Sequence, residues 1–358
     1  MLQLHFLIKT LRYPFNLVNY FNVQILSYLS EVVNIYAEEF CPLTCFSRRF
    51  CGIVYKSRQA MVLFDICWKF NRLSVATLAR ARLLPEKLKG SVIMGLRFCS
   101  ISSGSKGNCY VVMADETVLL IDAGISGKKI FNGLDELGLS PEEVQGVLVT
   151  HEHSDHTKGI KMVCKKGPDA KVYANRETWN CIVEERFEDR LCEFKSNEPF
   201  YINNLEIMPF SIHHDAADPV GFTITYKGRR LSVLTDTGHV TPDIYDHIKN
   251  SDLVVLESNH EVNILKVCSY PYKTKMRILG DYGHLSNETA AGLIVDLVGK
   301  DGGKHKTFLL AHLSMENNTP EMALLTSKNA LEENGLFSPD KVDIDVLRQN
   351  EQSYIYNV

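Results

Sequence analysis

The chain has 358 residues, 45% of them hydrophobic, and a formal net charge of -4. This is enough apolar material for one large domain or two ordinary ones. The distribution of charge excludes a membrane-spanning protein, because every long apolar run is interrupted by an acidic residue: Glu31, Glu38, Glu39 or Asp65. The ten cysteines have no paired C-x-x-C spacing, and no signal peptide pattern opens the chain. We therefore expect a soluble cytoplasmic protein with reduced thiols and no membrane span.

Charge divides the chain into two parts. Residues 1–93 carry 12 Lys and Arg against 5 Asp and Glu, whereas residues 94–358 carry 27 against 38. We expect residues 1–93 to be an N-terminal extension that is poorly structured or helical, with candidate helices at Asn16–Glu39 and Val62–Leu83. A well-formed strand follows Met94 at once, which makes Met94 the expected true start. The alternative is a genuine extension that docks on a partner or a membrane surface.

Short strands are predicted from Leu96 onwards, at Leu96–Ser102, Asn108–Ala114 and Thr117–Asp122. The glycine-rich stretch 102–108 between the first two lacks the spacing of a P-loop and is predicted to be a turn. Asp122 ends a buried strand. It is predicted either to cap a helix at Ser126–Leu137 or to orient metal ligands from behind.

Three histidines and an aspartate follow the next predicted strand, Val147–Thr150, in the pattern H-x-H-x-D-H. His151 and His153 are two apart on an extended segment, so their side chains point to the same side and can bind one cation. Asp155 and His156 come where the chain turns into a predicted helix (Thr157–Lys165) and can face a second cation. Imidazole and carboxylate are ligands of zinc and manganese. The pattern therefore predicts a metal site.

The remaining chain alternates strands and helices. Strands are predicted at Lys171–Ala174, Leu205–Ile212, Gly221–Tyr226, Leu231–Thr235, Leu253–Leu256 and Phe308–Ala311, and helices at Asn175–Phe187, Thr241–Lys249, Asn287–Gly299 and Pro320–Asn334. Several strands end in polar residues that can reach a shared site, namely His213, His214, Asp215, Asp236, Glu257 and His312. Such chemistry at strand ends, with helices as covering layers, is typical of α/β enzymes.

In their joint order, these motifs resemble the metallo-β-lactamase superfamily over residues 94–358. The segments 102–108, His214-Asp215-Ala216, Gly283–Asn287 and His312–Asn318 are similar to the YycJ-type (WalJ/VicX) hydrolases. The resemblance implies an α+β fold, a four-layer αββα sandwich, with two divalent metal ions, Zn²⁺ or Mn²⁺, at one edge. It also implies nuclease activity, as a 5′→3′ exonuclease on double-stranded DNA.

The resemblance also implies a ligand set. The first metal is assigned His151, His153 and His214, the second is assigned Asp155, His156 and His312, and Asp236 bridges both. His213 competes with His214 as third ligand of the first metal. Two cations bound in this way would lower the pKa of a shared water, supply hydroxide near neutral pH and hold the phosphate as charge develops on it. Asp155 is assigned to the catalytic residues as well as to the second metal.

A second resemblance, to enzymes that process the 3′ end of tRNA, concerns Glu257 and His284. It implies that Glu257 orients His284, which donates a proton to the leaving oxygen. Ser286 and Asn287 follow directly. They are predicted to contact phosphate or to cap the next helix.

Aromatic and cationic residues alternate between 270 and 277, at Tyr270, Tyr272, Lys273 and Arg277. This arrangement suits stacking on a base beside a neutralised phosphate, so these residues are candidate substrate contacts. The alternative is a solvated basic loop without such a role.

Two other functions compete with a nuclease. A small-ester or thioester hydrolase uses the same metal cage, and the acidic balance of residues 94–358 favours it. The second competing function is that of a regulatory protein whose metals serve only to stabilise its structure. The full ligand set together with a proton donor argues against it, because a structural site needs neither an open position nor an acid.

Overall fold

The computed structural model describes residues 95–182, 188–300 and 303–358, whose strands form two sheets of seven strands each. The first sheet has the order β14-β1-β2-β3-β4-β5-β6. Its strands are β1 (Leu96–Ser102), β2 (Cys109–Ala114), β3 (Thr117–Ile121), β4 (Val144–Leu148), β5 (Lys171–Ala174), β6 (Leu191–Glu193) and β14 (Tyr356–Asn357). Strand β2, which lies between β1 and β3, is buried along its whole length, which fits a sheet covered on both faces.

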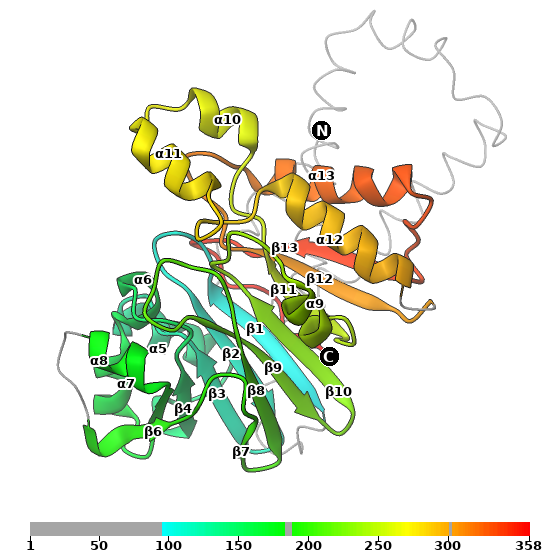
Figure 1. Cartoon of the computed structure of the whole chain (residues 1–358). Helices are drawn as coiled ribbons and strands as arrows, with labels where there is room; N and C mark the ends of the chain where they lie inside the picture. The colour runs from blue at the N-terminus through cyan, green and yellow to red at the C-terminus, as the bar shows by residue number, and fades with distance from the viewer. Residues whose placement is uncertain (1–94, 183–187, 301–302) are drawn as a thin grey trace, which may run out of the picture. The chain divides into compact units, whose positions relative to one another are not determined.

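The second sheet has the order β13-β12-β11-β10-β9-β8-β7. Its strands are β7 (Phe200–Ile202), β8 (Leu205–Ser211), β9 (Val220–Tyr226), β10 (Arg229–Leu234), β11 (Leu253–Glu257), β12 (Lys306–Ala311) and β13 (Val342–Val346). The two sheets pack face to face (Figure 1). An apolar cluster that includes Phe98, Tyr110 and Phe222 fills the space between them.

Helices cover the two outer faces. The first sheet carries α5 (Gly127–Glu136), α6 (Ser154–Thr157), α7 (Ile160–Lys166) and α8 (Arg176–Cys181), and the second carries α9 (Pro242–Ile248), α12 (Asn287–Lys300) and α13 (Pro320–Glu333). Separate apolar clusters join each helical layer to its sheet. The resulting four-layer αββα sandwich confirms the predicted fold class. Two further helices, α10 (Val262–Val267) and α11 (Tyr272–Leu279), project from one end of this sandwich (Figure 1).

Parallel pairing explains why the polar strand ends meet. Strands β3, β4 and β5 are mutually parallel, and so are β10, β11, β12 and β13. The carboxyl ends of parallel strands lie at the same edge of a sheet. The segments that follow β3, β4, β10, β11 and β12 therefore gather at one edge of the sandwich.

Most predicted strands are confirmed to within one or two residues, but several predictions need correction. The helix predicted at 157–165 is interrupted between α6 and α7, and the one predicted at 175–187 ends at Cys181, with 183–187 outside the described residues. Strands β6, β7, β13 and β14 and the helices α10 and α11 were not predicted. The extension 1–93, its two candidate helices and Met94 also lie outside the described residues. Among the residues that are described, no helix is long and apolar enough to cross a membrane.

Candidate metal centre

A first group of ligand atoms comes from three histidines. His151 and His153 follow β4, and His214 follows β8. The distance from His151 Nε2 to His153 Nδ1 is 3.0 Å, and one ring nitrogen from each of the three histidines lies within 4.8 Å of the others. Burial, and then the neighbouring imidazoles, lower the pKa of His151 well below its usual value. Its ring is therefore neutral, which is the form that binds metal.

A second group consists of Asp155, His156 and His312, whose ligand atoms also lie within 4.8 Å of one another. Asp155 Oδ2 is 3.5 Å from His156 Nε2 and 3.7 Å from His312 Nε2. The two histidines are buried, whereas the aspartate remains partly accessible.

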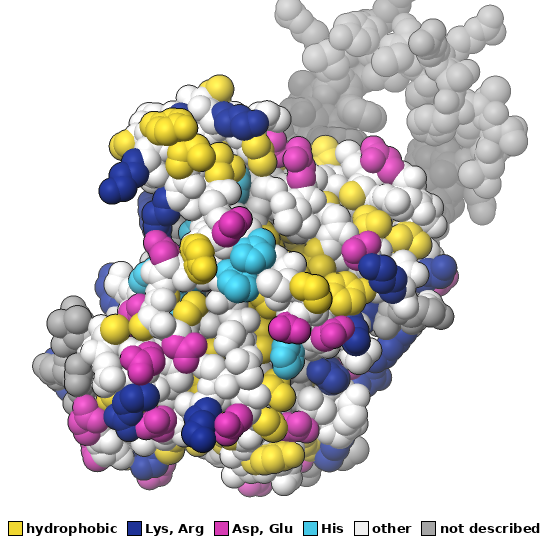
Figure 2. Space-filling view, viewed as in Figure 1, with side chains coloured by type: hydrophobic (Ala, Val, Ile, Leu, Met, Phe, Trp, Pro, Cys, Tyr) yellow, Lys and Arg dark blue, Asp and Glu magenta, His cyan; other side chains and the backbone are white. Residues whose placement is uncertain are grey.

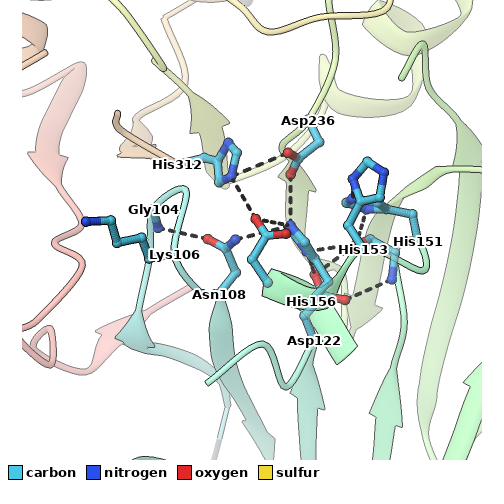
Figure 3. Close-up of polar contacts among 12 residues, drawn as sticks. Gly104, Lys106, Asn108, Asp122, His151, His153, His156, Asp236 and His312 are labelled. Carbon is cyan, nitrogen blue, oxygen red and sulfur yellow. Dashed lines mark hydrogen bonds and ion pairs between the residues drawn. The ribbon is translucent and has the colours of Figure 1, made fainter. Parts of the chain in front are cut away.

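Asp236 lies between the two groups and is separated from the end of β10 by one residue (Figure 3). Its Oδ2 is 3.4 Å from His156 Nε2, and its Oδ1 is 3.4 Å from His312 Nε2 and 3.9 Å from His214 Nε2. Asp236 Oδ2 and His312 Nε2 are both buried and have no hydrogen-bond partner within the described ranges. Buried polar atoms are rarely left unsatisfied. A cation coordinated by both atoms would satisfy them, so the residues present fit a metal.

Electrostatics favours positive charge in this cluster. Burial alone would lower the pKa of His312, but Asp236, Asp155 and Glu257 outweigh it and raise that pKa to about 10. The clustered carboxylates thus favour a positive charge at His312, and a divalent cation bound by the same atoms would supply that charge in place of a proton.

Asp122 supports the second group from behind. His156 Nδ1 donates a hydrogen bond of 2.7 Å to Asp122 Oδ2, which leaves Nε2 turned towards Asp155 and Asp236. The backbone N–H of Thr150 donates to Asp122 Oδ1 at 2.9 Å, and the Thr150 hydroxyl donates to Oδ2. Helix α5 is capped by Ser126 instead, so of the two predicted roles of Asp122 the geometry fits support of a ligand.

Glu257, at the end of β11, holds two histidines with one oxygen. Its Oε1 accepts hydrogen bonds of 2.8 Å from Nδ1 of both His284 and His312, and its Oε2 accepts from the backbone N–H groups of Thr237 and Leu285. Burial opposes ionisation of this carboxyl group, but His284 and His312 prevail and lower its pKa. Both rings are therefore fixed with Nε2 pointing away from Glu257.

Three residues of the site have a left-handed backbone. Asp122, Asp236 and His312 each follow a strand directly or after one residue, with φ of 60°, 59° and 54°. This conformation is unfavourable for residues other than glycine, although aspartate tolerates it better than most. Such strain is concentrated at functional sites. Here it turns the three side chains into the space between the sheet ends.

The competing ligand His213 lies outside the cluster. Its ring stacks on His239 with a centroid separation of 4.2 Å, whereas the buried His214 donates from Nδ1 to the carbonyl of Gly283 at 3.3 Å. The structure thus brings together His214, not His213, with His151 and His153.

Asn108 had not been singled out from the sequence, whereas Asp215 had been named only as one of the polar residues at strand ends that can reach a shared site. Asn108 Nδ2 is 3.2 Å from His156 Nε2, and Asp215 Oδ1 is 3.4 Å from His214 Nε2. Asp215 also accepts two hydrogen bonds from Arg277, of 2.6 Å at Nε and 2.8 Å at Nη2. Asn108 ends the glycine-rich loop, so its position next to the first sheet's strand ends was the signal that could have identified it. Lys106 of that loop points away from the cluster (Figure 3).

The structure divides the predicted substrate contacts. Residues 272–277 belong to α11, so most of this stretch is helical and not a loop. Tyr272 and Lys273 are exposed at the start of the helix, and Tyr270, just before it, is half-buried. Arg277 is engaged by Asp215, as described above. Ser286 accepts a hydrogen bond from Thr289 N and thereby begins α12.

The structure corrects the prediction that Asn287 contacts phosphate. Asn287 is fully buried, and its amide is bonded to Ser258 and Asn318. It therefore stabilises the interior and does not present its amide to a substrate.

Comparison with known proteins places this site in a family. Residues 117–308 match the family model of the beta-lactamase superfamily domain. The chain is 40% identical to the exodeoxyribonuclease YycJ of Bacillus anthracis, over 68% of this chain and 91% of that protein. It is 35% identical to the exodeoxyribonuclease WalJ of Streptococcus pneumoniae, over 66% and 89% of the two chains.

The fold agrees with a solved structure. The metallo-beta-lactamase fold protein YhfI of Bacillus subtilis superposes with a TM-score of 0.54 at 15% identity, covering 72% of this chain and 98% of the other. Family model, relatives and fold therefore lead to one conclusion: the chain belongs to the metallo-β-lactamase superfamily, as a metal-dependent hydrolase of the YycJ/WalJ type.

Proposed function

We propose that the protein is a dinuclear-metal-dependent phosphodiesterase that acts on DNA, as a 5′→3′ exonuclease on the double-stranded form. The observation that carries the proposal is the pair of ligand groups joined by Asp236, next to a histidine that Glu257 orients. The relatives named exodeoxyribonucleases, most of whose length the chain covers, support DNA as the substrate.

The ligand atoms divide between two cations, Zn²⁺ or Mn²⁺. In the proposal, His151, His153 and His214 hold the first, Asp155, His156 and His312 hold the second, and Asp236 contacts both. When bound, such a pair activates a water molecule near neutral pH and neutralises the phosphate as charge develops on it. Asp122 fixes the ring of His156 through its Nδ1, so that Nε2 keeps its direction.

His284 is the proposed general acid. Its Nδ1 is held by Glu257 at 2.8 Å, so that Nε2 is left to face the substrate, and 13% of its side chain is exposed. The departing 3′ oxygen of the cleaved bond needs a proton, and a histidine paired with a carboxylate is suited to supply it. Asp155, the accessible ligand of the second group, lies where it can accept a hydrogen bond from the attacking water.

The test uses the full chain with Mn²⁺ or Zn²⁺ on duplex DNA labelled at the 5′ or the 3′ end. We expect a 5′ label to be released at once in short products, while a 3′-labelled strand shortens gradually. Circular duplex DNA of the same sequence is the control and should resist. Single-stranded DNA, RNA and a chromogenic thioester are measured in parallel. Preferential cleavage of the thioester, or of the circle, would contradict the proposal.

A further inference from the structure

Helices α10 and α11 and the residues that follow them form an arm, residues 262–282, with an unusually apolar surface. Tyr272, Met276 and Leu279 lie at positions i, i+4 and i+7 of α11, so they share one face of that helix. All three are exposed, and Tyr272 has 77% of its surface accessible. Val267 and Tyr282 are exposed as well. Figure 2 shows the hydrophobic side chains of the arm gathered on this lobe.

The arm is also basic, unlike the domain that carries it. It has four cationic residues, Lys266, Lys273, Lys275 and Arg277, and one acidic residue, Asp281. Arg277 is paired with Asp215, and Lys275 Nζ donates to the carbonyl of Lys266. Lys266 and Lys273 are exposed and form no ion pair with any residue in the described ranges. Free cations thus flank the apolar face.

The base of the arm adjoins the metal centre. Arg277 binds Asp215, which lies 3.4 Å from His214, and the carbonyl of Gly283 accepts from the same histidine. The end of the arm also packs backbone to backbone on the loop after Asp236. A Cβ atom added at Gly238 would lie 2.3 Å from the carbonyl oxygen of Asp281. A ligand on the arm is therefore close to the site of cleavage.

We infer that the arm binds the nucleic-acid strand next to the scissile bond, with Tyr272 stacked on an unpaired base and Lys273 and Lys266 on flanking phosphates. The inference rests on the proposed function and adds where the strand lies. Aromatic side chains beside free cations suit the alternation of bases and phosphates along a strand. A protein partner would have to bring acidic groups to the same lysines, whereas a nucleic acid brings them at regular spacing.

The experiment compares two substrates of the full-length enzyme. The double variant Tyr272→Ala/Lys273→Gln should raise KM for a long DNA strand at least about tenfold, the order expected for one lost stacking contact. Hydrolysis of a small nitrophenyl phosphodiester should stay unchanged. Tyr272→Phe keeps the stacking ring and should behave like the wild type. The control is Tyr201→Ala/Lys128→Gln, because both residues are exposed and lie outside the arm.

Salt dependence provides a second measurement. Lys273→Gln alone should reduce the slope of log affinity against log salt by about one phosphate contact. If DNA is cleaved but the arm variants bind it like the wild type, the arm has another partner and the inference is wrong while the nuclease stands. Equal losses on both substrates would show that the arm acts through the metal centre and would also overturn it. Failure of the wild type on every nucleic acid would overturn the proposed function itself.

Discussion

At the scale of single residues, Asp236 is the point at which the two ligand groups meet. Its two oxygens reach His156 on one side and His312 on the other, both at 3.4 Å. No other carboxylate within the described ranges occurs in one ligand group with His151 and in another with His312. Asp236 is therefore the side chain whose substitution tests whether the two groups act as one centre.

Asp236→Asn tests this position with little disturbance, because asparagine tolerates a positive φ about as well as aspartate. A neutral amide cannot balance two cations, so we expect at most one metal per chain and almost complete loss of turnover. Elemental analysis of the purified variant gives the count. The exposed Asp246→Asn, whose partner is Lys249, is the control and should keep the wild-type metal content. Two metals per chain in the Asp236 variant would refute the bridge.

His284→Ala separates chemistry from metal binding. We expect kcat for DNA to fall by about two to four orders of magnitude, the usual contribution of general acid catalysis, with the metal content unchanged. A nitrophenyl phosphodiester has a leaving group that needs no proton, so its hydrolysis should fall much less. Because His284 Nδ1 is 3.7 Å from Asp236, loss of a metal is the informative alternative. A variant that loses metal and slows both substrates equally would make His284 a ligand.

At the scale of elements, close backbone packing fixes the metal loop. The N–H of Asn108 donates to the carbonyl of Asp155, and the N–H of Ala123 donates to that of His156, at 2.8 and 2.7 Å. Gly124 lies against the same loop, where an added Cβ would be 1.5 Å from the carbonyl oxygen of Asp155. The residues before β2 and the residues after β3 thus both pack against the backbone of the loop at 155–156.

Gly124→Ala should therefore be strongly disruptive, because the obstacle is backbone and cannot rotate away. We expect a loss of about 1–3 kcal/mol or more of stability, together with weaker metal binding by Asp155 and His156. Gly292→Ala is the matched control. That glycine lies in α12 with nothing within 4 Å of its Cβ position, so alanine should stabilise the helix by about 0.5–1 kcal/mol. Thermal unfolding compares the two, and similar melting temperatures would contradict this account.

The same scale explains which elements could be predicted. Strands such as β3 and β11 are continuous apolar runs buried on both faces, and this is the pattern that sequence shows most clearly. The helices of the arm were missed because α10 and α11 have only six and eight residues and bury one residue each, Leu265 and Ile278. The apolar face of α11 covers two turns and is too short to mark a helix in the sequence. Strands β7 and β14, of three and two residues, are too short to show any period.

At the scale of the whole molecule, the site is assembled from both sheets and can be predicted from sequence only in part. The ligands of H-x-H-x-D-H lie within six consecutive residues, 151–156, and appear as a motif. Asn108 and His156 are 48 residues apart, and Asp215 and Arg277 are 62 apart. Such contacts follow from the packing of the sheets, which local patterns do not encode. The histidine after β8 was assigned through family resemblance, since His213 and His214 are equivalent by chemistry alone.

Removal of metal should weaken the whole fold. Without a cation, the carboxylates of both sheets repel one another and buried atoms such as Asp236 Oδ2 stay unsatisfied. Metal at about a hundred times its Kd should contribute about 2.7 kcal/mol, which corresponds to a rise in Tm of several degrees. Calorimetry with Mn²⁺ or Zn²⁺ and then with a chelator measures it. Asp236→Asn should show a smaller shift, and an unchanged Tm in the wild type would rule out a metal that bridges the sheets.

The shared oxygen of Glu257 limits how this enzyme can be redesigned. Because Oε1 binds both His284 and His312, a change at Glu257 alters a proposed acid and a proposed ligand together. A change at His284 leaves the other bond in place. An effort to adapt the enzyme to substrates with different leaving groups therefore has freedom at position 284 and almost none at 257. Any evolved variant of this sequence faces the same restriction, because a substitution at Glu257 changes the hydrogen bonds of both histidines at once.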